Sequence, residues 1–555
     1  MHRERRISQG ERRISSPATP VDDLCRSYLD LKYHFDPAAA SAAGRVDLDS
    51  HLASFDPDTT RAHLAALRSV AGAVEELQPD ELQQEIDRTA LLGEIRTTLF
   101  RLEHEQPHVR NPGFWLGHLF QGLYALLART HDDPAARVPA VVARLSATPR
   151  FLEQAGRSLE SPPSVFLDTA LGMLGGGGEL ITQMVAVFGE AAPELFEELK
   201  QAGGLALESL VKFGTTLRDE LEPDPDPHAF AIGEDQFSRR LHYEHALAGG
   251  PPELWRYGLH LQEEVTAEID ALAGRLGSRP WRELVARLQE ESPDEGELLD
   301  VYRSELDRAC DFVRQHDLVE VPHGGVDVVP TPAFLKALVP FAAYEPPPIY
   351  LAQRTGRFYV TLPDASLSDE QRARQRRGHC RHAIPAMVAH EAYPGHHLQL
   401  LTSQGLGSEV RRHIWTPVMV EGWALYCEQL VEEGGFYRTE EARLFRLLNL
   451  LWRAIRVVLD VGLHTRGMTP AEAVSYMLEH LPIERASAEA EVRRYCAWPT
   501  YQLCYAVGRR ELLQLRAAWQ QRDSSGYSAR RFHDEVMSYG GLPVTLARWG
   551  MDLEE

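Results

Sequence analysis

The amino-acid sequence predicts a mainly α-helical fold with one small β-sheet. Apolar residues recur at the three- and four-residue spacing of a helix that buries one face, as at Leu92, Ile95, Leu99 and Leu102. The same spacing returns in a later segment, at Leu444, Leu448, Leu451, Ile455 and Val458. Hydrophobic residues make up 44% and charged residues 25% of the 555-residue chain, so most of it can bury a core.

Clusters of proline and glycine mark where helices are expected to end, because proline cannot continue a helix and glycine makes it costly. They lie at residues 161–163, 175–178, 223–227, 249–252 and 346–348. The four glycines at 175–178 could suggest a phosphate-binding loop, but no Lys-Ser or Lys-Thr follows them. We therefore expect a flexible loop there. Thr469, Pro470 and Glu472 have the pattern of a capping box and predict a helix start.

Two short segments, residues 326–329 and 357–362, are rich in residues that favour strands and predict the small sheet. Residues 1–20 carry charge and serine but nothing to bury, so we expect a disordered tail. A helical N-terminal lobe is expected over residues 21–320. Residues 321–555 are expected to form a second region with the small sheet, further helices and the histidine motif described below.

Composition excludes several classes of protein. A formal net charge of -23 argues against a nucleic-acid binder, because phosphate contacts need an excess of Lys and Arg. No run of about 18 apolar residues is evident, and the N-terminus has no apolar core of a signal peptide, so we expect no membrane partner and a cytoplasmic location. Six scattered cysteines without a CxxC pair predict no disulfide scaffold. No feature of the sequence specifies an oligomeric state.

A histidine motif lies near residue 390. Zinc hydrolases of the HExxH type place two histidines one helical turn apart, with a glutamate beside the metal-bound water. His390 and Glu391 begin such a motif, but Pro394 stands where the second histidine would be. The next histidines are His396 and His397, and six residues of ideal helix climb about 9 Å, which is too far for one ion.

The residues between these histidines predict how the gap is shortened. Pro394 has no N–H to donate to the carbonyl of His390, and its ring pushes that carbonyl away. Gly395 permits a tight backbone. We therefore expect a local bulge in the helix that brings two histidines together.

A third ligand is needed if tetrahedral zinc is to keep one position open for water. Glu421 is the candidate, at the start of a predicted helix that includes residues 421–428. Glu428 falls two turns further on the same face, where it could orient a metal ligand or pair with an arginine.

The sequences HEAYPGHHLQ, at residues 390–399, and EGWALYCE, at residues 421–428, resemble the bacterial domain-of-unknown-function family 885. That family is similar to the helical gluzincin (thermolysin-like) zinc peptidases, which include thimet oligopeptidases and thermostable carboxypeptidases. The resemblance extends from about residue 344 to residue 508. It implies a two-lobed, metallopeptidase-like helical fold with a deep cleft and with the small sheet beside the metal helix.

The resemblance also implies roles for individual residues. His390 and Glu421 are expected to bind one zinc ion, and Glu391 is expected to act as the general base. His396 is favoured as the second histidine, because a glycine precedes it and a leucine follows two residues later, as in the helical peptidases. His397 remains the alternative ligand.

A hydrogen-bond donor for the developing oxyanion is expected from a residue downstream of the third ligand. The resemblance makes Tyr505 the leading candidate, with Tyr501 and His464 as rivals. Asp460 lies one turn before His464, so the two could instead form an internal hydrogen-bonded pair. A substrate carboxylate could be held by one of four arginines, Arg493, Arg494, Arg509 and Arg510. By analogy with peptidases, the strand at residues 357–362 could align an extended substrate on an exposed edge.

These expectations converge on a zinc-dependent hydrolase that cleaves peptide or peptide-like amide bonds in short substrates. One alternative keeps the site but acts on a small metabolite amide in a specialised pathway. Another alternative is a non-catalytic binding protein stabilised by its metal. Glu391 disfavours the last, because a structural zinc site needs no base and typically has four protein ligands.

Overall fold

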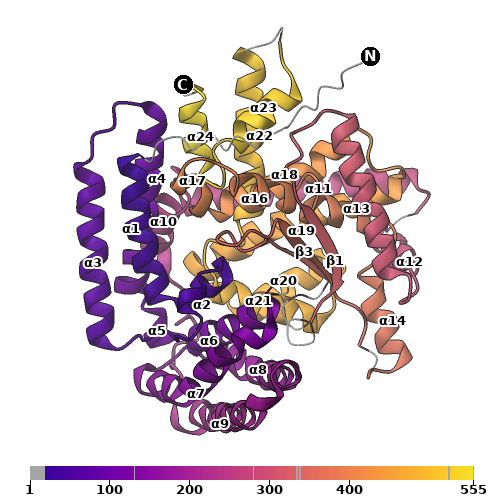
Figure 1. Cartoon of the computed structure of the whole chain (residues 1–555). Helices are drawn as coiled ribbons and strands as arrows, with labels where there is room; N and C mark the ends of the chain where they lie inside the picture. Colours follow the sequence, from indigo (N-terminus) through magenta and orange to yellow (C-terminus); the bar gives the residue numbers. More distant parts are fainter. Residues whose placement is uncertain are drawn as a thin grey trace, which may run out of the picture.

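The computed structural model describes residues 19–129, 132–278, 280–332, 336, 339, 341–364, 366–522 and 526–553. These residues form a mainly helical protein with one three-stranded sheet (Figure 1). The first half of the chain contains α1 (Pro20–Phe35), α2 (Pro37–Ala43), η1 (Val46–Leu48), α3 (Pro57–Glu76), α4 (Leu82–Phe100), η2 (Arg101–Glu105), α5 (Pro107–Arg110), α6 (Pro112–Ala128), α7 (Pro134–Ser158), α8 (Ser164–Ala191), η3 (Pro193–Leu195), α9 (Phe196–Thr215), η4 (Thr216–Glu220), α10 (Gly233–Tyr243) and α11 (Pro251–Arg275).

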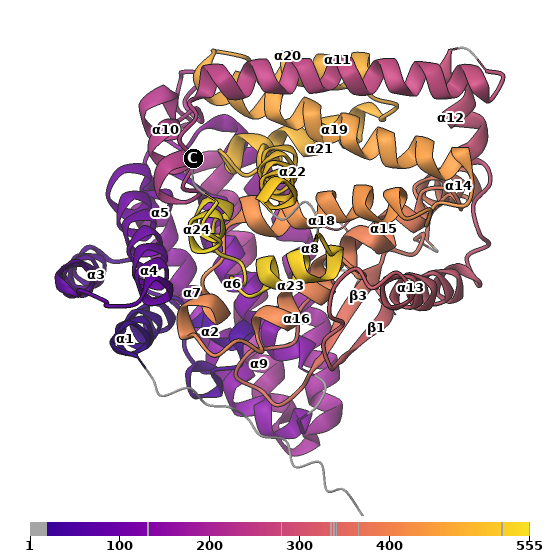
Figure 2. The ribbon, with the colours of Figure 1, turned by 90° about the horizontal axis from the view of Figure 1, so that it is seen from above.

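The second half carries the sheet and the remaining helices. They are α12 (Trp281–Gln289), α13 (Leu298–Gln315), β1 (Gly325–Pro330), β2 (Ala342–Glu345), β3 (Thr355–Val360), α14 (Asp369–Arg377), α15 (Ile384–Glu391), α16 (His396–Ser403), α17 (Glu409–His413), α18 (Pro417–Glu433), α19 (Glu440–Thr465), α20 (Pro470–His480), α21 (Arg485–Ala497), α22 (Cys504–Arg522), α23 (Ala529–Met537) and α24 (Val544–Gly550). Seen from above, α11 and α19 run side by side, and α18 lies next to α15 (Figure 2).

The first helix begins earlier than the sequence predicts. Thr19 is the N-cap of α1, and its side chain and that of Asp22 form a reciprocal capping box. The predicted tail over residues 1–20 is therefore two residues too long, and residues 1–18 lie outside the described residues. The capping box predicted at Thr469 is confirmed, with Glu472 as its partner at the start of α20.

The glycine run at residues 175–178 is not a loop, as the sequence suggested, but the middle of α8. A side chain at Gly177 would overlap the ring of Phe120 on α6, with its Cβ only 1.9 Å from a ring carbon. Glycine at this point lets α6 and α8 pack closely, which outweighs its low helix propensity.

Helix α8 also corrects an expectation about membranes. It contains a stretch of 18 residues with a mean hydropathy of 1.3, which is long and apolar enough to cross a membrane. In this structure 28% of that stretch is buried. The prediction that no such segment exists is therefore wrong by length and composition. A core helix of a soluble protein can pass the same test.

The sheet has the strand order β1-β3-β2. β1 pairs with β3 in parallel, with Val328 opposite Phe358, and β2 pairs antiparallel to β3, with Tyr344 opposite Phe358. Both predicted strands are present, but β3 is the central strand. The prediction that residues 357–362 offer an exposed edge is therefore wrong, because β3 is paired on both sides. β2, which the sequence analysis missed, is an edge strand of the described sheet.

The hydrophobic core does not follow the boundary expected at residue 320. One cluster of buried side chains joins Cys25, Leu67 and Ile95 from the first helices to Val388 and Trp423 beside the histidine motif. A second cluster surrounds α19, and a third fills the bundle of α6–α9. The first helices are therefore packed against the elements that carry the candidate site.

Candidate metal centre

Helix α15 presents His390 and Glu391 at its C-terminal end. Its apolar face is buried through Ile384 and Val388, which holds the helix against the core. The helix ends after Glu391, the Tyr393–Pro394 peptide is cis, and a new helix, α16, begins at His396. The expected local bulge is longer in the structure, because residues 392–395 form a full break between two helices, and this break brings His390 and His396 together as predicted.

Gly395 is the residue that lets this break be so tight. A Cβ at this position would lie 1.8 Å from the carbonyl oxygen of His390 and 2.5 Å from that of Ala389. Only glycine allows the backbone to pass this close. As a result His396 returns to His390, and their ring centroids are 4.9 Å apart at an angle of 87°.

His390, His396 and Glu421 form a buried cluster whose ligand atoms all lie within 4.8 Å of one another. Oε2 of Glu421 is 3.8 Å from Nε2 of His390 and 3.4 Å from Nε2 of His396. Ligands about 2.0–2.1 Å from a tetrahedral zinc ion would be about 3.4 Å apart. The three residues therefore have the chemistry and the spacing of a two-histidine, one-carboxylate metal site.

Glu421 lies on α18, and this helix is hydrogen-bonded to the break at residues 392–395. Nε1 of Trp423 donates a hydrogen bond of 2.9 Å to the carbonyl of Pro394. On the neighbouring helix α22, a Cβ at Gly508 would lie 1.9 Å from the carbonyl oxygen of Val418 and 2.7 Å from Cα of Gly422. The hydrogen bond and the close packing of the two helices fix the position of Glu421 relative to both histidines and to α22.

Two roles were left open for Glu428 on α18: orienting a metal ligand or pairing with an arginine. The structure has it hydrogen-bonded to a histidine, and no arginine among the described residues forms an ion pair with it. Its Oε1 lies 2.9 Å from Nδ1 of His390, and its Oε2 accepts a hydrogen bond of 3.3 Å from Asn449. A proton on Nδ1 leaves Nε2 of His390 free to bind a metal.

The charges of the cluster favour a cation at its centre. Burial lowers the pKa of His390, but the carboxylates of Glu421 and Glu428 outweigh it and raise the pKa to about 9. Burial alone would raise the pKa of the Glu421 carboxyl, but His390 and His396 hold it well below its usual range. Nδ1 of His396 is buried without a hydrogen-bond partner among the described residues. The electrostatics thus suit a positive ion between the three side chains.

Glu391 lies beside the cluster and lines the adjoining cavity. Its Oε2 accepts a hydrogen bond of 3.0 Å from the backbone N–H of Tyr344 on the edge strand β2. This bond fixes one carboxylate oxygen. No arginine or lysine among the described residues forms an ion pair with Glu391, so its other oxygen remains available to a substrate or water.

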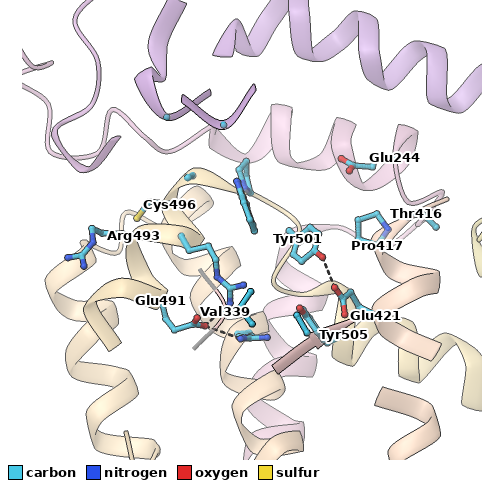
Figure 3. Close-up of a pocket in the computed structure, with 18 of the residues that line it drawn as sticks. Glu244, Val339, Thr416, Pro417, Glu421, Glu491, Arg493, Cys496, Tyr501 and Tyr505 are labelled. Carbon is cyan, nitrogen blue, oxygen red and sulfur yellow. Dashed lines mark hydrogen bonds and ion pairs between the residues drawn. The ribbon is translucent and has the colours of Figure 1, made fainter. Parts of the chain in front are cut away.

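Tyr501, in the turn before α22, and Tyr505, on α22, lie beside Glu421 (Figure 3). The hydroxyl of Tyr501 donates a hydrogen bond of 2.5 Å to Oε1 of Glu421. The ring of Tyr505 lies nearly parallel to that of His390, with centroids 6.2 Å apart. Burial and the charge of Glu421 raise the pKa of both phenols, so both keep their protons at neutral pH.

Asp460 supports the turn that carries Tyr501, a role that sequence analysis did not assign. Its carboxylate accepts hydrogen bonds of 3.1 Å from the backbone N–H groups of Thr500 and Leu503. Thr500 has a φ of 66°, a left-handed conformation that a non-glycine residue rarely adopts. The turn places Tyr501 and, one helical turn later, Tyr505.

Two predicted residues are not brought to the cluster. His397 is buried with one ring nitrogen 3.0 Å from the hydroxyl of Tyr344 and the other 3.1 Å from that of Tyr393. Both nitrogens are engaged, so the geometry selects His396 in place of its neighbour. His464 does not line the cavity; its Nε2 lies 3.0 Å from the carbonyl oxygen of Tyr495.

The cluster opens into a cavity of about 2940 Å³. The cavity is lined by α4, α6, α8 and α10 on one side and by α15, α18, α19, α21 and α22 on the other. Its described lining includes 13 Lys or Arg against 10 Asp or Glu, and two of the acids are Glu391 and Glu421. The cavity is therefore more positive than the chain as a whole, whose net charge is -23.

The fold is similar to that of two solved structures. One is described as a "putative lipoprotein of unknown function" from Shewanella oneidensis; it is 20% identical, with a TM-score of 0.77, and the match covers 97% of this chain and 100% of that one. The other is described as the "putative lipoprotein" from Colwellia psychrerythraea; it is 20% identical, with a TM-score of 0.80, and the match covers 96% of this chain and 99% of that one. No curated protein matches the chain.

A family described as bacterial protein of unknown function (DUF885) matches residues 37–551. The match includes the whole cluster of His390, His396 and Glu421, the strand β2 beside Glu391 and the two tyrosines. It also includes the helices of the first half that line the far side of the cavity. The chain belongs to the DUF885 family.

Proposed function

We propose that this protein is a zinc-dependent hydrolase of peptide or peptide-like amide bonds in short substrates. The observation that carries the proposal is the buried cluster of His390, His396 and Glu421 with the carboxylate of Glu391 beside it. Two histidines and a carboxylate, with a fourth position open, are the ligands of catalytic zinc in thermolysin and carboxypeptidase A. The order of these residues along the chain also resembles that of the helical gluzincin peptidases.

When bound, zinc would polarise the scissile carbonyl and lower the pKa of a water molecule. Glu391 takes a proton from the attacking water and delivers it to the leaving nitrogen. Tyr344 keeps one oxygen of Glu391 in place through its backbone N–H. The Tyr505 phenol, protonated at neutral pH, donates to the oxygen on which negative charge develops.

Tyr501 serves a different purpose, because its proton is already shared with Glu421 at 2.5 Å. It orients that carboxylate so that Oε2 faces the two histidines. In this proposal, Tyr501 and Glu428 hold the metal ligands in place. Glu391 transfers the proton, and Tyr505 stabilises the developing negative charge.

Peptides are favoured over small metabolite amides by the size of the cavity. A volume of about 2940 Å³ exceeds the usual 300–1,000 Å³ of a small-molecule site, and the edge strand β2 lies in its wall. Because the cluster is enclosed by helices from both halves of the chain, short or unfolded substrates fit better than folded proteins.

The proposal is tested by metal analysis followed by turnover. We expect one zinc ion per chain, and we expect mass spectrometry to detect hydrolysis of a mixed peptide library that stops on adding a chelator and returns with zinc. A panel of metabolite amides is run in parallel. Cleavage of the panel alone would move the substrate to that class, and bound metal without any turnover would favour a binding protein.

The variant Glu391→Gln separates the base from the metal site. It should keep its zinc and lose at least about a thousandfold in kcat, because it cannot accept the proton. Glu484→Gln is the matched control, since Glu484 lines the same cavity and its carboxylate has no partner among the described residues. Substantial activity in Glu391→Gln would refute the assignment.

A further inference from the structure

Arg453 is a cavity-lining arginine without an anionic partner. It lies on α19, and no carboxylate of the described residues forms an ion pair with it. Its Nε is buried with no hydrogen-bond partner among those residues, and one terminal nitrogen reaches only the carbonyl of Asn449 on its own helix, at 3.4 Å. Arg453 is half-buried, and a buried donor such as its Nε is costly to leave without an acceptor, which a ligand could supply.

The neighbouring arginines are already engaged. Arg456 donates to Tyr495 and to Glu491, and Arg494 pairs with the same glutamate at 2.8 Å. Arg493 has no ion pair among the described residues, but its side chain points away from Tyr505 and Glu421 (Figure 3). The guanidinium groups of Arg453 and Arg456 both lie over the Tyr505 ring, and of these two only Arg453 has no carboxylate partner among the described residues.

Two of the arginines considered from the sequence lie elsewhere. Arg509 donates to Gln429, and Arg510 pairs with Glu253 and Glu511. Neither of them lines the cavity as the structure describes it. Arg453 was not among the four candidates.

The position of Arg453 relative to the metal cluster is fixed by two contacts. Its guanidinium carbon lies 5.6 Å from the ring centroid of Tyr505, and the same ring also neighbours His390, Tyr501 and the guanidinium of Arg456, the last at 4.9 Å. One turn earlier on α19, Asn449 holds Glu428, which in turn holds His390. The same face of α19 therefore carries Asn449, which supports the cluster through Glu428, and Arg453, which is separated from His390 by the Tyr505 ring.

We propose that Arg453 binds the C-terminal carboxylate of the substrate, so that the enzyme acts on short peptides with a free carboxyl end. This inference rests on the proposed hydrolase function and adds the substrate class. Guanidinium binds carboxylate through two parallel hydrogen bonds. The Tyr505 ring lies between Arg453 and His390. One or two extended residues, each at most about 3.6 Å long, would span this ring between the bound carboxylate and the scissile bond.

The excess of basic side chains in the cavity supports an anionic substrate. A positive cleft in an acidic protein concentrates anions near the site and raises their association rate. The cavity extends well beyond the cluster towards α6 and α8, which leaves room for residues on the amino side of the scissile bond.

The test compares two synthetic tripeptide pools that differ only in a free carboxylate or a carboxamide at the C-terminus. Their binding is measured by calorimetry on Glu391→Gln with zinc bound, and their turnover by mass spectrometry on the enzyme with Glu391 intact. We expect at least tenfold tighter binding and higher kcat/KM for the free-acid pool. In Arg453→Gln this preference should fall to about twofold or less, mainly through KM.

Two further variants make the result specific. Arg453→Lys keeps the charge but loses the two parallel hydrogen bonds, so it should retain part of the preference. Arg374→Gln removes a charge from the same cavity, where Arg374 already pairs with Glu370, and should leave the preference unchanged. Thermal unfolding of each variant checks that the fold is intact.

The outcomes separate this inference from the proposed function. If both pools are hydrolysed equally, or if the free-acid preference survives in Arg453→Gln, the inference is wrong and the hydrolase proposal stands. If neither pool is hydrolysed but the free acids bind through Arg453, the anion site stands and the hydrolase proposal fails. Absence of any free-acid preference in binding also counts against the inference.

Discussion

Glu428 and His390 form a buried hydrogen bond of 2.9 Å through Nδ1 of the histidine, which leaves Nε2 facing Glu421 in the candidate metal site. The carboxylate is fully buried on α18 and is held in turn by Asn449 on α19. A proton shared between Nδ1 and this carboxylate leaves Nε2 as the ligand atom and makes it more basic. Three helices, α15, α18 and α19, thus meet in one chain of hydrogen bonds.

Replacing Glu428 by alanine should weaken metal binding by about 10- to 100-fold, because His390 would lose the partner that orients its ring. Zinc affinity is measured by competition with a chromogenic chelator. Glu433→Ala is the matched control, since Glu433 lies on the same helix and pairs with Arg516 away from the cluster. Equal affinity in the Glu428 and Glu433 variants would contradict the orienting role.

The ligand spacing could be read from the sequence, but the backbone between the ligands could not. Pro394 predicted a departure from a regular helix, and the structure has a complete break there. Which of two adjacent histidines turns inward depends on the exit direction of that break and on the hydroxyls of Tyr344 and Tyr393, which engage His397. Those contacts join segments whose proximity no local pattern encodes.

The helical class and two of the three strands were predictable because periodicity and β-branched residues are local signals. The errors arose where tertiary contacts override local propensity. Gly177 is helical because Phe120 needs the space, and β2 is a strand because β3 is beside it. Arg453 was not among the candidates for the same reason, since the lack of a hydrogen-bond partner at its Nε is visible only in three dimensions.

Gly395→Ala should damage both stability and metal binding. The added Cβ would lie 1.8 Å from the carbonyl oxygen of His390, so the break must open and His396 must move. We expect the free energy of unfolding to fall by about 1–3 kcal/mol and zinc affinity to fall at least tenfold. Urea unfolding and chelator competition measure the two effects.

The control for this variant is Gly407→Ala, where a Cβ would meet nothing within 4 Å. It should change neither quantity appreciably. If Gly395→Ala binds zinc as tightly as the unsubstituted protein, the close approach at Gly395 is not what brings the two histidines together.

Tyr505→Phe and Tyr501→Phe should fail in different ways. Tyr505 lies against His390 and its hydroxyl has no hydrogen bond within the described residues, so its loss should lower kcat about a hundredfold at unchanged zinc content. Tyr501 is hydrogen-bonded to Glu421, so its loss should mainly lower zinc affinity, by about tenfold. Steady-state kinetics at saturating zinc, together with metal titration, distinguish the two. The reverse pattern would exchange their roles.

His464 should make stability depend on pH without affecting turnover. Burial lowers its pKa to about 4, whereas in the unfolded chain it is about 6.5. Between these values the unfolded state binds a proton that the folded state does not. The contribution of neutral His464 is therefore fully present above pH 6.5 and is lost as pH falls towards 4.

His464→Gln tests this, because glutamine keeps a donor for the carbonyl of Tyr495 and cannot be protonated. The drop in unfolding free energy between pH 7.5 and pH 5, measured in urea, should be smaller in the variant by about 2 kcal/mol. Its kcat at pH 7.5 should stay within about twofold, since His464 does not line the cavity. The same drop in both proteins would show that the pKa of His464 does not differ between the folded and unfolded states. A large loss of kcat in the variant would show that this histidine takes part in the reaction.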